Sequence, residues 1–136
     1  MSVVSELIKE ENGALCFGNY ELDAKTKLDG FEFQGDKYKI KTFNEITKLE
    51  RNGSFVYESV PGTAVHDFKA TADSVEFVVE GIEDSQVTLE LEAGQEYMAI
   101  VNGKESGTVK TTLGGKLSLS VELNPGESSS VKVTKL

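Results

Sequence analysis

The sequence of 136 residues contains no tryptophan and only one cysteine, one histidine and one arginine. A single cysteine excludes an internal disulfide, and one cysteine with one histidine falls short of the four nitrogen or sulfur ligands of a structural zinc site. We therefore expect no disulfide and no bound metal, and no cofactor either, because the glycine motifs that bind phosphates or dinucleotides do not occur. Cys16 lies between Leu15 and Phe17, which predicts a buried core residue.

The chain also lacks a long apolar run, and its first residues, MSVVSELIKEENG, include no basic leader segment. This start is typical neither of a membrane anchor nor of a signal peptide. With 38% hydrophobic and 27% charged residues, the composition is that of a soluble globular protein. We expect a cytoplasmic protein that is long enough to form its own hydrophobic core.

Basic residues are outnumbered, with 14 lysines and arginines against 23 acidic residues and a net charge of -9. The imbalance is spread evenly, since residues 1–68 hold 12 acids and 8 bases and residues 69–136 hold 11 acids and 6 bases. Nucleic acids and anionic membranes are bound by clustered lysines and arginines. We therefore expect neither nucleic acid nor a membrane as a partner of this acidic protein.

Apolar and polar residues alternate over much of the chain, which is the pattern of strands with one buried and one solvated face. The alternating runs are 31–33, 38–43, 55–57, 75–77, 87–91, 117–123 and 131–133. Residues that favour turns separate these runs. The sequence therefore predicts an all-β fold, an antiparallel β-sandwich.

Two Asn-Gly pairs predict tight hairpins, because both residue types tolerate the positive φ of a type I′ turn. Asn102-Gly103 would join a strand over 97–101 to one over 104–111. Asn12-Gly13 would join the first residues to a strand ending at Phe17. A helix over these first residues is the alternative there, and we favour the hairpin because a helix this short is marginal without packing.

Two further features of the first half leave more than one interpretation open. In segment 44–51, Ile46 and Leu49 have helical spacing after a capping Asn44, which is compatible with one short helical turn. Strand patterns on both sides of residue 70 are compatible with an N-terminal β lobe over 1–70 packed against a second β lobe over 71–136, or with one compact sandwich.

The stretch FVYESVPGTAVHDF gathers the residues most suggestive of chemistry. Pro61-Gly62 predicts a type II turn between two strands. His66 and Asp67 are adjacent and would point to opposite faces of a strand, whereas His66 could meet Glu58 across the turn and form an acid-base pair. Glu58, His66 and Asp67 are the only candidate catalytic residues, and we favour the interpretation as a turn with a structural histidine.

Enzyme motifs are otherwise lacking, because the sequence has no nucleophile elbow and no phosphate-binding loop. Acidic pairs are abundant by chance, and none is singled out as the acid and base of a glycosidase. Tyr20, Tyr38, Tyr57 and Tyr97 lie in strand-like segments, where packing with a solvated hydroxyl is the expected role rather than sugar stacking.

Two resemblances are carried by longer stretches. With ENGALCFGNYEL and YKIKTFNEITKLERNGSFVYESVPGTAVHDF, the sequence is similar over nearly its full length to small proteins of anaerobic Gram-positive bacteria that are labelled endosialidases. Residues 96–136 resemble the small immunoglobulin-like sandwich appended to many glycan-processing enzymes. The first resemblance implies a glycan substrate, but sialidases hold the sugar carboxylate with several arginines, and Arg51 is the only one in this chain.

The leading functional hypothesis is a non-catalytic protein that acts by self-association, as a homo-oligomer, or by binding another protein. It rests on the missing catalytic motifs and on the many strands, whose edges offer pairing sites. The alternative is a glycan-directed protein, either a weak endosialidase-like hydrolase or a lectin-like module, which would use Glu58, His66 and Asp67.

Overall fold

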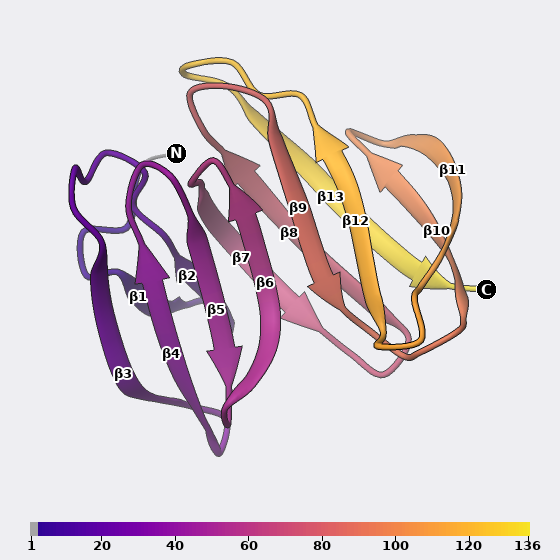
Figure 1. Ribbon diagram of the computed structural model, residues 1–136, viewed down its shortest axis with the longest axis horizontal. Helices are drawn as coiled ribbons and strands as arrows, with labels where there is room; N and C mark the ends of the chain where they lie inside the picture. Colours follow the sequence, from indigo (N-terminus) through magenta and orange to yellow (C-terminus); the bar gives the residue numbers. More distant parts are fainter. Residues whose placement is uncertain (1–2) are drawn as a thin grey trace.

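The computed structural model describes residues 3–136, and regular structure in this range is entirely β. Two antiparallel sheets pack face to face as a sandwich (Figure 1), which confirms the predicted fold class. No helix that could span a membrane occurs in residues 3–136.

Sheet A contains, in order across it, β1 (Ile8–Glu11), β2 (Ala14–Phe17), β7 (Ala64–Ala70), β8 (Ser74–Glu80), β13 (Ser128–Lys135), β10 (Glu96–Val101) and β11 (Lys104–Lys110). Sheet B contains β12 (Lys116–Val121), β9 (Ser85–Glu90), β6 (Ser54–Val60), β5 (Thr47–Arg51), β4 (Asp36–Thr42) and β3 (Thr26–Phe33).

Both sheets combine strands from the two halves of the chain. The halves meet where β7 pairs with β8 in sheet A and where β6 pairs with β9 in sheet B. In Figure 1 the indigo and magenta strands of the first half therefore continue edge to edge into the orange and yellow strands of the second. The junction near residue 70 is the tight connection of the β7–β8 hairpin.

Both predicted Asn-Gly hairpins are present. β10 and β11 are joined by Asn102 and Gly103, whose φ angles are 52° and 80°. β1 and β2 are joined in the same way by Asn12 and Gly13, with φ angles of 54° and 80°. A positive φ at both central residues is the requirement of the turn types that match the twist of a two-residue hairpin.

Segment 44–51 is not helical, so the interpretation as a helical turn is wrong. Residues 47–51 form β5, which pairs with β4 on one side and β6 on the other. Thr47 and Leu49 face the core with no exposed surface, while Lys48 between them faces outward. Neighbours on both sides satisfy the backbone groups of this strand, and that tertiary pairing outweighs the weak helical spacing of two apolar residues.

The segment at Pro61-Gly62 does not form the predicted type II turn. Gly62 lacks the positive φ that this turn requires, and it lies against the carbonyl oxygen of Phe43. β6 ends in sheet B at Val60 and β7 begins in sheet A at Ala64. The chain therefore crosses from one layer of the sandwich to the other at this point instead of folding back within a hairpin.

Aromatic rings from four strands meet at the centre of the sandwich. Tyr57 packs edge to face against Phe17 and Phe77, with ring centroids 5.2 and 5.6 Å apart, and Phe68 stacks on Phe77 at 5.8 Å. These are favoured geometries for aromatic pairs. Cys16 is buried beside this core, as predicted, and burial raises the pKa of its thiol.

Hydrogen bonds of buried hydroxyl groups join the crossing segment, residues 61–63, to the inner face of sheet B. The Thr63 hydroxyl lies 2.8 Å from the Tyr57 hydroxyl and 2.7 Å from that of Ser59. The Thr47 hydroxyl donates to the carbonyl oxygen of Thr63 at 2.8 Å and accepts its backbone N–H at 3.1 Å. Because the single proton of Thr47 is used in this way, the Thr42 hydroxyl at 2.8 Å must be the donor to it.

This hydroxyl network predicts how stability responds to alkaline pH. Burial raises the pKa of Tyr57 from 10.0 to about 12, so the unfolded chain loses this proton before the folded one does. The contribution is fully present below pH 10 and is lost as the pH rises towards 12. Tyr57→Phe should cost about 1 kcal/mol at pH 7 and should flatten the fall in stability above pH 10, as measured by urea unfolding across this range.

Tyr20 provides a second test of the same effect. Burial, followed by its hydrogen bond to Glu80, raises the pKa of Tyr20 to about 12 as well. Tyr20→Phe should therefore remove a similar part of the alkaline slope with little loss of core packing, and the double variant should remove both parts. Parallel curves of stability against pH for Tyr57→Phe and the unmodified protein would contradict the prediction.

Candidate binding face

The structure does not bring the three candidate catalytic residues together. Glu58 lies on β6 between the buried Tyr57 and Ser59 and so faces outward from sheet B. His66 lies on β7, next to the buried Val65, and faces outward from sheet A. Glu58 and His66 therefore lie on opposite outer faces of the sandwich, and the acid-base pair that the sequence suggested does not form.

Asp67 lies on the same outer side of the sandwich as His66. Its φ angle of 55° marks an irregularity where β7 pairs with β8. Asp67, Glu76 and Lys132 line a hollow of about 400 Å³ on sheet A, where charges of both signs are mixed. Within residues 3–136, no group of three or more histidine, cysteine or acidic side chains is arranged to hold a metal ion.

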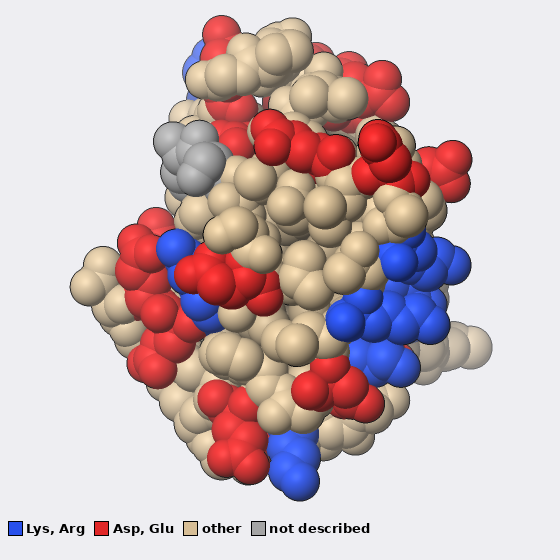
Figure 2. All heavy atoms as spheres, turned by 90° about the vertical axis from the view of Figure 1, so that its left-hand side faces the viewer, with Lys and Arg blue, Asp and Glu red and all other residues tan. Residues whose placement is uncertain are grey.

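The outer face of sheet B gathers lysines from three neighbouring strands. Lys27 of β3 lies directly opposite Lys41 of β4, and Lys41 lies directly opposite Lys48 of β5. Since neighbouring strands are about 4.8 Å apart, these three side chains form a row across the sheet. Lys25 and Lys39 flank the row, and we call the five lysines the basic face. Figure 2 shows blue side chains gathered on the side of the molecule that sheet B forms.

The alternation within β4 explains why lysines collect there. In the segment KYKIKT, Tyr38, Ile40 and Thr42 are buried. The residues between them, Lys39 and Lys41, must then point to the opposite side of the sheet. The same alternation in β5 places Lys48 outward between two buried residues.

No lysine of the basic face forms an ion pair within the described residues, although Glu50 lies opposite Lys39 and Glu58 lies opposite Lys48 in the strand register. Ion pairs in the described residues join Lys9 to Glu11, Lys116 to Glu90 and Lys135 to Glu92, so none includes a lysine of this face. Partial burial, and after it the charges of Lys27, Lys25, Lys48 and Lys39, lowers the pKa of Lys41. Like charges directly opposite each other destabilise a sheet, so this arrangement costs stability.

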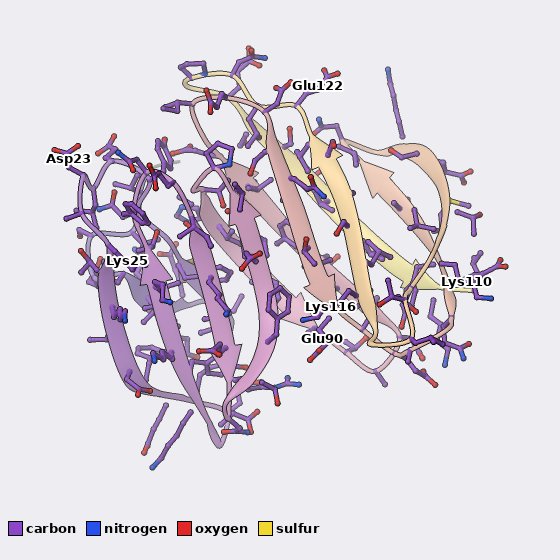
Figure 3. The ribbon with its side chains drawn as sticks, viewed as in Figure 1. Asp23, Lys25, Glu90, Lys110, Lys116 and Glu122 are labelled. Atoms are coloured by element: carbon purple, nitrogen blue, oxygen red, sulfur yellow. The ribbon has the colours of Figure 1, made fainter. Side chains whose placement is uncertain are left out.

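The opposite end of the same outer surface is neutralised. The Lys116 ammonium group lies 3.4 Å from the centroid of the Phe55 ring and 3.5 Å from a carboxylate oxygen of Glu90. Figure 3 shows Lys116 and Glu90 side by side at the ends of β12 and β9, far across the sheet from Lys25. On this outer surface, the described lysines that form no ion pair therefore lie in the β3–β5 part of sheet B.

The only arginine of the chain, Arg51, lies at one end of the sandwich. It lines two hollows of about 530 and 290 Å³ that share Val56 and Phe68 as apolar floor. The larger hollow also includes Glu90 and Glu92. A single guanidinium beside two carboxylates differs from the arginine cluster that grips the carboxylate of a sialic acid.

Comparisons with known proteins do not identify the chain, because no family model, no curated protein and no solved structure matches it. The chemistry of the basic face follows from its own groups. Lysine ammonium groups carry a full charge near pH 7 and only donate hydrogen bonds. They suit carboxylate or phosphate oxygens presented by a partner.

Repulsion within the lysine row predicts that removing its central charge stabilises the protein. Lys41→Gln should raise the free energy of unfolding by about 0.5 kcal/mol at low salt, because Lys27 and Lys48 then lose a like-charged neighbour. At about 1 M salt, screening should abolish the difference. Urea unfolding at both salt concentrations measures this.

Lys104→Gln is the matched control, since Lys104 on β11 lies opposite the apolar Val101 of β10. It removes the same charge without relieving repulsion from an opposing lysine. It should leave stability unchanged at both salt concentrations. A Lys41→Gln variant that is destabilised, or stabilised equally at low and high salt, would show that repulsion across the row is not significant.

Proposed function

We propose that this protein is a non-catalytic binding protein that acts by protein–protein interaction, and that the basic face binds an acidic partner segment. One observation carries the proposal: Lys27, Lys41 and Lys48 lie in register on adjacent strands without an ion pair among the described residues. Carboxylates of a partner would relieve the repulsion within this row. That relief would contribute to the free energy of binding.

The size of the basic face favours a short acidic segment over a long polyanion. Three strands span only about 10–15 Å across the sheet, and Figure 2 shows acidic side chains around the lysines. Nucleic acid would extend beyond the face and meet these acids within the Debye length of about 8 Å. A short acidic protein segment, from another protein or from a second copy of this chain, could place its carboxylates on the row of Lys27, Lys41 and Lys48.

An acidic glycan is the second candidate ligand. Phe55 is part-exposed on the same outer surface, with the ammonium groups of Lys48 and Lys116 at 5.9 and 3.4 Å from its ring centroid. A ring beside cations suits a sugar that carries a carboxylate. Binding of glycan oligomers therefore belongs in the same experiment.

Charge reversal tests the proposed protein interaction. The variant Lys41→Glu/Lys48→Glu should bind a labelled decaglutamate peptide about tenfold more weakly than the unmodified protein, because two attractive pairs become repulsive. The binding of the unmodified protein should weaken steeply with salt. Fluorescence anisotropy measures both effects, and sedimentation velocity at low and high salt measures self-association of the same samples.

The matched control is Lys104→Glu/Lys110→Glu on β11, which changes the net charge by the same four units, from -9 to -13. It should retain decaglutamate binding. Equal losses in both variants would show that only net charge matters, and the proposal would then fail. Binding of a galacturonate oligomer or duplex DNA without binding of decaglutamate would also reject an acidic protein segment as the ligand.

A further inference from the structure

An apolar hollow adjoins the basic face on the same side of sheet B. Phe43, Ile46, Val60 and Pro61 line it, and its volume is about 660 Å³. Val60 is 52% exposed, so the hollow presents apolar surface directly to solvent. Lys25 lies at the rim, with its ammonium group 5.9 Å from the centroid of the Phe43 ring.

Strand register places this hollow beside the lysine row. Val60 follows Glu58 by two residues, and Ile46 precedes Lys48 by two residues on the antiparallel neighbour, so both steps run in the same direction. Phe43 follows Lys41 by two residues in the same way. Two residues of a strand span about 6.8 Å. An apolar row therefore lies next to the lysine row, with about this separation.

The limited extent of the lysine row and its acidic surroundings favour a short polypeptide segment over a lipid surface. The open apolar hollow gains free energy when a side chain covers it and excludes water. An anionic membrane would extend over the acidic side chains that surround the lysines (Figure 2), whereas a short segment can place its carboxylates on the lysines and an uncharged side chain between Glu45 and Glu83 at the rim. The lysines beside the hollow at the same time require that the partner carry carboxylates.

We infer that the hollow receives one apolar side chain from the acidic segment that the basic face binds. This inference rests on the proposed function and adds a second chemical requirement to the partner. The apolar residue should lie about 7 Å from a carboxylate along the segment. Two residues of an extended chain or four of a helix provide this separation.

Two peptide probes separate the hollow from the basic face. One is decaglutamate, and the other is the same peptide with a phenylalanine in place of one central glutamate. The phenylalanine peptide should bind about tenfold more tightly, since burying part of one aromatic side chain contributes on the order of 1.4 kcal/mol. The gain should persist at high salt, where the affinity for decaglutamate falls.

Val60→Ser should abolish the advantage of the phenylalanine peptide and leave decaglutamate binding unchanged. Ile82→Ser is the matched control, because Ile82 is 55% exposed near the same end of the sandwich but does not line the hollow. This control should keep the full advantage. Circular dichroism and urea unfolding of both variants verify that the fold is retained.

The outcomes distinguish the two proposals. If decaglutamate binds through the lysines and phenylalanine adds nothing, or if Val60→Ser keeps the advantage, the hollow is not an anchor site and only the inference fails. If neither peptide binds, the proposed function fails first. If vesicles of phosphatidylserine and phosphatidylcholine bind in a manner that Val60→Ser abolishes while neither peptide binds, a lipid surface is the occupant and both proposals are wrong.

Discussion

The buried hydroxyl network around Thr63 is the constraint on which the arrangement of sheet B depends. Thr42, Thr47 and Ser59, from three adjacent strands, all turn their side chains inward to reach one another or the crossing segment. A buried hydroxyl without a partner costs about 1–3 kcal/mol, and in the described residues every buried side-chain polar atom has one. Gly18 fits the same junction, because a Cβ there would collide with the carbonyl oxygen of Thr63.

This constraint also determines the outer surface. Each inward hydroxyl has a charged neighbour in sequence, so Lys41, Lys48 and Glu58 must face solvent in the same cross-strand row. A slip of one residue in register would expose the hydroxyls and bury the lysines, and an isolated buried charge is very costly. The lysines therefore remain side by side despite their mutual repulsion, because the interior leaves them no other position.

The sequence reveals local features of this fold better than distant ones. Alternation and Asn-Gly pairs are read within a few residues, and the strands and both hairpins follow from them. β5 was missed because its inward residue Thr47 is polar, so that Ile46 and Leu49 alone carried the apolar pattern. The crossing at Gly62 was missed because only the pairing of β6 with β9, distant in sequence, shows that β6 and β7 belong to different sheets. The resemblance to endosialidase-labelled proteins stays a prediction.

The candidate site was hidden for a related reason. A net charge counted over each half of the chain averages the charges on both faces of every strand. In segment 37–41, by contrast, lysine occupies every second position, which already indicates that these lysines share one face of a strand. Register then adds Lys27 and Lys48 from neighbouring strands, which no count along the chain reveals. In a protein with a net charge of -9, such a local patch would orient the proposed acidic partner during encounter more than it would strengthen the final complex. Salt-independent affinity must then come from apolar contact, and the hollow beside the row is the nearest surface that offers it.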